Sequence, residues 1–142
     1  ASVSFMLPLS FERAQAFWQR VAAGVHGGER ALLVAQDGPG AIVGTVQLML
    51  AQPENQPHRA DLAKMLVHRR ARRQGLGERL MRAAEDTPRA CGKTLLVLDT
   101  VSGGDAERLY TRLGWQRVGV IPDYAQWPQG GLCATTVFYR RL

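Results

Sequence analysis

The stretch His68–Gly77, HRRARRQGLG, decides how this sequence folds and what it can bind. It holds four arginines and one histidine, followed by two glycines that a single leucine separates. Two interpretations fit these residues. The stretch is either a basic patch for a polyanion such as nucleic acid, or a phosphate-binding loop with arginines at its rim. The segments on each side favour one of the two.

The segment before the stretch has the pattern of a strand. In RADLAKMLV (59–67), every second residue falls on the same side of an extended chain. The residues expected on one face are Asp61, Ala63, Met65 and Val67. The chain therefore enters the basic stretch from the end of a strand.

The segment after the stretch has the pattern of a helix. GLGERLMRAAED begins near residue 75 and has an apolar face. The residues expected on that face are Leu76, Leu80, Met81 and Ala84. We expect the helix to end near Thr87, because Pro88 is unfavourable inside a helix.

This context favours the phosphate-binding loop. A helix start presents unpaired N–H groups, and glycines let that backbone approach an anion closely. The loop is not a Walker A motif, because no Gly-Lys-Ser/Thr closes it, and Leu80 stands where a dinucleotide fingerprint has its third glycine. As a solvated charge run, the stretch would leave its glycines unexplained.

The other segments give an α/β order with a mixed sheet in one domain, residues 1–142. We expect a helix at 10–23, capped by Ser10, and a hairpin of strands 31–37 and 41–52. The remaining expected elements are a strand at 94–100, a helix at 105–114, and strands at 115–121 and 133–142 joined by the loop 122–131.

Composition is that of a globular chain, with 46% hydrophobic and 21% charged residues. No apolar run is long enough to span a bilayer, and we expect neither a membrane partner nor a signal peptide. Cys91 and Cys133 show no partner pattern, which favours free thiols in the cytoplasm. The net charge of +6 points to a phosphorylated or polyanionic partner.

Two motifs resemble those of the GNAT N-acetyltransferase superfamily. Arg72, Gly75 and Gly77 form R-x-x-G-x-G just after the strand that ends at Val67, and AERLYTRLGW (106–115) resembles the family's A-x-x-L-Y-x-x-x-G-F segment. A closer resemblance, to the tabtoxin-resistance type, covers HRADLAKMLVHRRARRQGLG (58–77), LLVLDT (95–100) and VGVIPDYAQWPQGGLCATTVFYRRL (118–142).

The resemblance implies the GNAT fold, a mixed sheet that splays between the strands at 59–67 and 94–100 and is flanked by helices. The family's N-terminal strand and helix are not recognisable, and we expect them to be absent from these residues. Gly103 stands where many relatives carry an asparagine that contacts the cofactor arm, so that contact is expected to be replaced or missing.

The resemblance also implies acetyl-CoA as acyl donor, with no metal. The backbone N–H groups of the loop would bind the pyrophosphate, the strand edge would pair with the pantetheine arm, and an N–H near Leu66 or Val67 would stabilise the oxyanion. The expected cofactor-binding residues are Met65, Leu66, Val67, Arg72, Arg73, Gln74, Gly75, Leu76, Gly77 and Glu78.

Three residues are candidates for catalysis. Asp61 and Asp99 are candidate bases, and Tyr110 matches the family tyrosine that faces the sulfur. Each also has a plain structural interpretation, as an exposed strand residue, a strand-end cap and a core aromatic respectively. Tyr124 and Trp127 are expected either to wall the acceptor pocket or to cover a subunit interface.

These residues predict an N-acetyltransferase that acetylates a primary amine of a small, amino-acid-like or toxin-like molecule. Two alternatives stay open: a sensor that binds acyl-CoA without catalysis, and a basic module that binds nucleic acid through Arg69 to Arg82. Under the enzyme hypothesis we expect no nucleic-acid partner. A homodimer is expected only by analogy with relatives.

Overall fold

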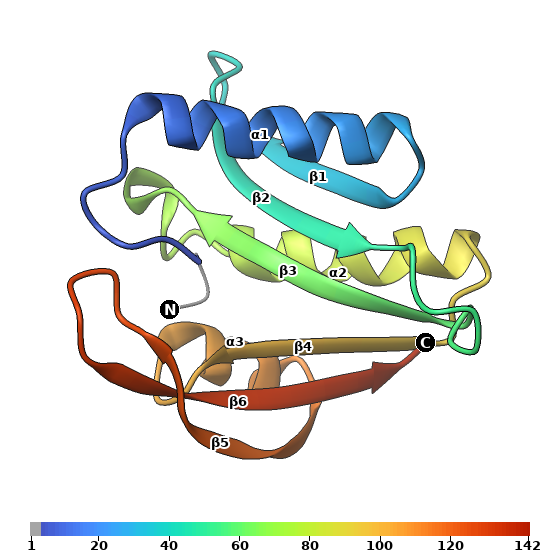
Figure 1. The fold of residues 1–142 in the computed structure, drawn as a ribbon. Helices are drawn as coiled ribbons and strands as arrows, with labels where there is room; N and C mark the ends of the chain where they lie inside the picture. Colours follow the sequence, from blue (N-terminus) through green and yellow to red (C-terminus); the bar gives the residue numbers. More distant parts are fainter. Residues whose placement is uncertain (1–3) are drawn as a thin grey trace.

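The computed structural model describes residues 4–142 and has six strands in one mixed sheet, ordered β1-β2-β3-β4-β6-β5 (Figure 1). The strands are β1 (Arg30–Gln36), β2 (Ile42–Met49), β3 (Arg59–Val67), β4 (Leu95–Val101), β5 (Gln116–Gln126) and β6 (Leu132–Arg141). The helices are α1 (Phe11–His26), α2 (Leu76–Ala90) and α3 (Asp105–Arg112), with a short 3₁₀ turn at Arg69–Ala71. Within residues 4–10 no strand precedes α1.

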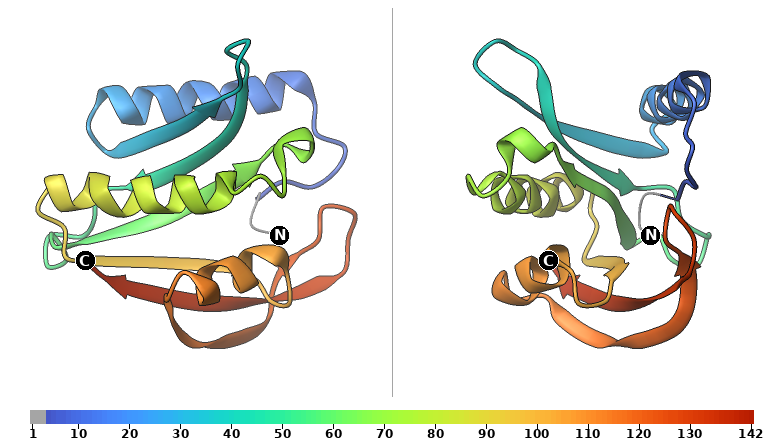
Figure 2. Two further views of the ribbon diagram at one scale, coloured as in Figure 1. Left: turned by 180° about the vertical axis from the view of Figure 1, so that it is seen from behind. Right: turned by 90° about the vertical axis from the view of Figure 1, so that its left-hand side faces the viewer.

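Helices cover both faces of the sheet. Helix α1 lies on one face, and α2 and α3 lie on the other (Figure 2). The start of α1 follows from its sequence, because the Ser10 side chain accepts a hydrogen bond from the Arg13 backbone N–H at 3.2 Å, as the sequence predicted. The helix runs past residue 23 to His26 and ends at Gly27.

The sheet opens between β3 and β4. These parallel strands pair only at Arg59 with Leu95, Ala60 with Leu96 and Asp61 with Val97. Beyond Asp61, β3 continues to Val67 and β4 to Val101 without further pairing, and Figure 1 shows the two strands diverging. The predicted splay is confirmed, and it leaves an open seam between the two strands.

A bulge at Lys64 changes which side chains of β3 share a face. Lys64 has φ +52°, the register with β2 shifts between Thr45 and Gln47, and the Thr45 hydroxyl donates to the Lys64 carbonyl at 3.2 Å. An extra residue in a strand reverses the alternation beyond it. The expectation that Asp61, Ala63, Met65 and Val67 share one face was therefore wrong.

The two halves of β3 serve different faces of the sheet. Ala60 and Leu62 are buried in the main core, and beyond the bulge Met65 and Val67 pack against that same core. Asp61 consequently lies on the face that carries α1.

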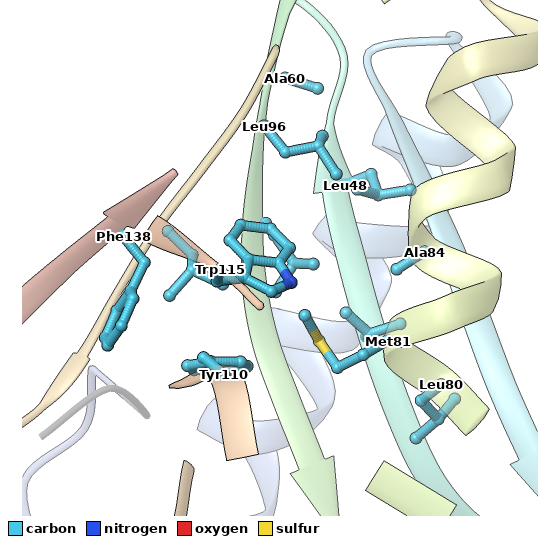
Figure 3. Packing of buried hydrophobic residues seen from close by; sticks show 12 residues of the cluster. Leu48, Ala60, Leu80, Met81, Ala84, Leu96, Tyr110, Trp115 and Phe138 are labelled. Carbon is cyan, nitrogen blue, oxygen red and sulfur yellow. The ribbon is translucent and has the colours of Figure 1, made fainter. Parts of the chain in front are cut away.

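The core lies between the sheet and the helices α2 and α3. Its largest fully buried side chains include Phe138, Leu48, Met81 and Leu96, and the rings of Tyr110 and Trp115 fill the space beside them (Figure 3). Trp115 donates its indole N–H to the buried Glu85 carboxylate at 3.2 Å. The other oxygen of Glu85 pairs with Arg140 Nε at 3.0 Å, which joins α2 to β6.

Two boundaries differ from the sequence prediction. Helix α2 continues to Ala90, and Pro88 sits in its last turn with its ring fully buried, so packing offsets the lost N–H bond. Strand β5 continues through residues 122–126, which were expected to be loop. It does so past a register shift at which Asp123 has φ +52°, because Ala125 and Gln126 pair with Cys133 and Leu132 of β6.

Candidate functional site

The loop between β3 and α2 forms a cradle of backbone N–H groups. Among residues 4–142, no acceptor bonds the backbone N–H groups of residues 73–78, and the first intrahelical bond of α2 runs from Arg79 N to Gly75 O at 3.1 Å. Gly75 caps the helix with φ +74° and provides no side-chain bond. Six consecutive unsatisfied donors at a helix start make a site for an anion.

The arginines around this cradle have distinct roles. Arg70 pairs with Asp37 at 2.7 Å, and Arg82 pairs with Glu78 at 2.8 Å. Arg72 Nε donates to the Val67 carbonyl at 3.2 Å, which ties the loop to the end of β3. Residues 69–82 contain six arginines: Arg69, Arg70, Arg72, Arg73, Arg79 and Arg82. Three of these six hold local structure, so a continuous basic surface for nucleic acid is not needed to explain them.

Gly77 permits a close approach between two helices. A Cβ at this position would lie 3.1 Å from Leu109 Cδ2 of α3. The start of α2 and the side of α3 therefore meet where a side chain larger than hydrogen does not fit without movement.

A cleft of about 640 Å³ lies between the loop, the end of β3 and α3. Nine of the ten expected cofactor-binding residues line it: Met65, Leu66, Val67, Arg72, Arg73, Gly75, Leu76, Gly77 and Glu78. The tenth, Gln74, does not line the cleft, and its side-chain amide donates to the Arg70 carbonyl at 3.3 Å.

One wall of this cleft, formed by α3, was not predicted from the sequence. The residues concerned are Asp105, Ala106, Arg108, Leu109 and Arg112. They recur at helical spacing, which is the signal that they share a face. Their position opposite the loop is a tertiary feature that the sequence does not show.

The main chain at the end of β3 points into the open seam. His68 N donates to Val43 O at 2.8 Å, and Val67 pairs with Gly44 one step earlier. In an antiparallel ladder hydrogen-bonded and non-bonded pairs alternate, so the N–H and C=O of Val67 face away from β2. Of the two expected oxyanion donors, Leu66 and Val67, the register favours Val67.

A second cavity, of about 260 Å³, lies on the face of β4 that carries Asp99, opposite the face on which Leu96 and Leu98 enter the core. It is lined by Ser4, Leu62, Ala63, Lys64, Asp99, Val101, Tyr124, Ala125, Cys133, Ala134 and Thr135. Asp99 accepts a hydrogen bond from the Thr135 hydroxyl at 2.8 Å, and Lys64 Nζ donates to Ser4 Oγ at 2.7 Å. Tyr124 lines this cavity and Trp127 does not.

The negative charge of Asp99 acts on two ionisable groups, Tyr110 and Lys64. Burial, and after it the negative charge of Asp99, raises the pKa of Tyr110 to about 12. Burial lowers the pKa of the Lys64 ammonium, and the charge of Asp99 opposes that shift. Asp99 therefore lies within electrostatic reach of a group from the core side and a group from the cavity.

Tyr110 is a core residue as well as a candidate for catalysis. It is 4% exposed, and its ring lies 5.9 Å from that of Phe138 and 6.0 Å from that of Trp115, between centroids (Figure 3). It lines neither the cleft nor the second cavity. Among residues 4–142, no hydrogen bond engages its hydroxyl.

The two candidate bases occupy different surroundings. Asp61 and Asp99 lie on adjacent strands and on the same face, with Asp61 opposite Val97. Only Asp99 lines the second cavity. The Asp61 carboxylate is 38% exposed and pairs with Arg59 at 2.9 Å between Oδ1 and Nη1.

The region before α3 is held by Glu107. Its carboxylate accepts from the Gly103 backbone N–H and from the Thr136 hydroxyl at 3.1 Å. The hydrogen bond from Gly103, and to a smaller extent Thr136 and Arg117, lowers the pKa of Glu107. Gly103, the position at which many relatives carry asparagine, thus serves the start of α3 and does not line the main cleft.

Residues 4–142 contain neither a metal-binding cluster nor a membrane-spanning helix. No cluster of three or more His, Cys, Asp or Glu side chains is arranged to hold a metal ion. No helix is long and apolar enough to cross a membrane. Both cysteines are free thiols, Cys91 exposed and Cys133 buried at the second cavity.

Comparison with known proteins gives this arrangement a family. A model of the acetyltransferase (GNAT) family matches residues 4–115. A ribosomal-protein-alanine N-acetyltransferase from Brucella melitensis has a similar structure, with a TM-score of 0.77 and 22% identity over 90% of this chain and 78% of that one. The chain described here therefore belongs to the GNAT acetyltransferase family, whose members use acetyl-CoA as the acetyl donor.

Two further solved structures show the same fold. The chain yncA from Salmonella typhimurium, whose structure holds its cofactor acetyl-CoA, has a TM-score of 0.76 and 21% identity over 94% of this chain and 75% of its own. A GCN5-related N-acetyltransferase from Kribbella flavida has a TM-score of 0.70 and 25% identity over 80% of this chain and 68% of its own.

Proposed function

We propose that this member of the GNAT family transfers the acetyl group of acetyl-CoA to the primary amine of a small molecule. The observation that carries the proposal is the placement of two cavities around one open seam. The cleft on the core side ends in an anion cradle, and the cavity on the other side holds the Asp99 carboxylate.

The donor side of the site fits acetyl-CoA. The six N–H groups of residues 73–78 would bind its pyrophosphate, and Arg73, which lines the cleft, would add positive charge. Acetyl-CoA supplies an acetyl thioester, whose acetyl group moves to the amine nitrogen while CoA leaves as the thiol. The Val67 N–H, which faces the seam, would donate to the carbonyl oxygen as negative charge develops there.

Asp99 is the preferred candidate for the base. It lines the acceptor cavity, and the Thr135 hydroxyl holds one of its oxygens. The other oxygen would bind the ammonium of the acceptor and accept its proton. Asp61, which pairs with Arg59 outside the cavity, stays the second candidate.

Tyr110 would act as a hydrogen-bond donor to the leaving sulfur. With a pKa of about 12, its hydroxyl stays protonated near neutral pH. A thiol has a pKa of roughly 8.5, so complete proton transfer from this phenol to the thiolate is unfavourable. Stabilisation of the thiolate by a hydrogen bond is the role that this pKa allows.

Three finer assignments complete the proposal. The segments 58–77, 95–100 and 118–142 resemble the tabtoxin-resistance type, and this resemblance supports an amino-acid-like acceptor. The two free thiols are consistent with a reaction in the cytoplasm. A homodimer is proposed by analogy alone.

The test is acetyl transfer itself, measured as release of CoA thiol and as acetylated product by mass spectrometry over a panel of primary amines. In Asp99→Asn the amide oxygen can still accept from Thr135 but cannot take a proton, so we expect turnover to fall by roughly 10²- to 10⁴-fold. Asp86→Asn, at an exposed carboxylate on α2, is the control and should retain turnover.

Each contrary outcome identifies a different error. Equal turnover in Asp99→Asn and the wild type, with loss in Asp61→Asn, would move the base to Asp61. Tight acetyl-CoA binding without acetylation of any amine would favour the sensor. Binding of a random DNA duplex that weakens steeply with salt, without acetyl-CoA binding, would favour the nucleic-acid module.

A further inference from the structure

We propose that Lys64 binds a carboxylate of the acceptor, so that the acceptor is a small zwitterion such as a free α-amino acid. The inference rests on the proposed function, because the second cavity is an acceptor site only if the chain acetylates an amine. It adds a specificity-determining residue and a chemical class of substrate to that function.

The first support is the position of Lys64 at the bulge of β3. A non-glycine residue with φ +52° is uncommon, and such a conformation is maintained where the surrounding structure requires it. The bulge separates the residues that line the acceptor cavity, which end at Lys64, from those that line the acetyl-CoA cleft, which begin at Met65. Lys64 is thus on the acceptor side, immediately beside the seam.

The second support is the charge pattern of the cavity. Among its eleven described lining residues, Lys64 and Asp99 alone carry a formal charge. They have opposite signs and come from β3 and β4, the strands on either side of the seam. A zwitterion presents an ammonium to Asp99 and a carboxylate to Lys64, whereas an acceptor with only an amine matches Asp99 alone.

The polar side chains next to these charges can assist a carboxylate and an amine. The Ser4 hydroxyl, which accepts from Lys64 Nζ at 2.7 Å, also carries a proton that it can donate to a carboxylate. Thr135 already directs its hydroxyl to Asp99 at 2.8 Å, which holds that carboxylate in place for the amine.

The third support is size. A volume of about 260 Å³ corresponds to roughly nine water molecules at about 30 Å³ each, which accommodates a free amino acid and excludes a folded protein. A peptide would bring an amide, and not a carboxylate, next to its terminal amine. The cavity therefore favours a free amino acid over a protein N-terminus.

The experiment compares kcat/KM for each of a panel of free amino acids with kcat/KM for the matching amino-acid amide and decarboxylated amine. We expect the wild type to prefer the best amino acid over its amide by roughly 10- to 100-fold. Lys64→Met should abolish most of this preference, and Lys64→Arg should retain most of it. Arg20→Met, at an exposed cation on α1, is the control and should retain the full preference.

The comparison between variants removes two artefacts. An amide and its parent acid differ in the basicity of their amines, but that difference is the same for every variant. It cancels when the acid-to-amide ratio of kcat/KM in a variant is divided by the same ratio in the wild type. A general folding defect in Lys64→Met lowers both rates together, and thermal unfolding followed by circular dichroism detects it independently.

A binding measurement separates this inference from the proposed function. Calorimetric titration of the amino acid and of its amide into the protein with CoA present needs no turnover. Binding of the acid that exceeds that of the amide and is lost in Lys64→Met supports the carboxylate site, even if no amine is acetylated. Equal rates and equal affinities for acid and amide in the wild type, or an equal loss of both in Lys64→Met, would overturn the inference.

Discussion

Substitution of Gly77 by alanine tests the acetyl-CoA cleft most directly. The added Cβ would lie 3.1 Å from Leu109 Cδ2, whereas carbon atoms in contact prefer about 3.5–4.0 Å. Either the Leu109 side chain or the start of α2 must then move by roughly a few tenths of an ångström. Overpacking of this kind costs about 1–3 kcal/mol, and it would displace the N–H groups that we propose bind the pyrophosphate.

We expect Gly77→Ala to weaken acetyl-CoA binding by roughly 10- to 100-fold, because the misplacement affects a row of charge-assisted hydrogen bonds. Calorimetric titration of acetyl-CoA into wild type and variant measures the effect. Gly38→Ala is the matched control, since a Cβ there meets nothing within 4 Å and Gly38, in the β1–β2 turn, does not line the cleft. Unchanged affinity in Gly77→Ala would refute the argument that this loop holds the donor.

Three further predictions concern stability. The folded state raises the pKa of Tyr110 to about 12, above the value of about 10 in the unfolded chain. We therefore expect the free energy of unfolding to fall by up to roughly 2–3 kcal/mol as the pH rises from about 10 to about 12. Urea unfolding of Tyr110→Phe should lack this pH dependence. The pKa of Glu107 is lowered in the folded state, so its contribution to stability should be lost as the pH falls below about 4.5. In Glu107→Gln, the unfolding temperature should therefore fall less steeply with decreasing pH than in the wild type. Glu85→Ala should cost about 2–4 kcal/mol in chemical denaturation, because Arg140 and the Trp115 indole would lose a buried partner; a loss below about 1 kcal/mol would contradict this.

Local patterns in the sequence were sufficient for most of the elements. The strand at 59–67 has the predicted ends, and Ser10 caps its helix as predicted, because periodicity and capping depend on residues within one or two turns. The end of α2 was misjudged, since a local rule against Pro88 does not include the free energy gained by burying its ring. The end of β5 was misjudged because β6 provides its pairing.

Some features of the site depend on residues close together in the sequence, and others depend on contacts between distant segments. The loop from Arg72 to Gly77 could be identified from sequence, because its donors and its glycines are consecutive residues. The sequence could not decide whether Asp61 or Asp99 is the better candidate for the base. That choice depends on where β3 and β4 part and on which side chains a bulge turns toward the cavity.

By itself, the sequence determined the order of the elements, the position of the glycine loop that we propose binds an anion, and the family to which the chain belongs, since each of these depends on neighbouring residues. Only the tertiary structure decided that β3 bulges at Lys64, that pairing with β4 stops at Asp61 and that α3 closes the cleft. These features arise from strand pairing and packing between segments distant in the chain. Such contacts depend on the packing of many core residues at once, so no short pattern of residues predicts them.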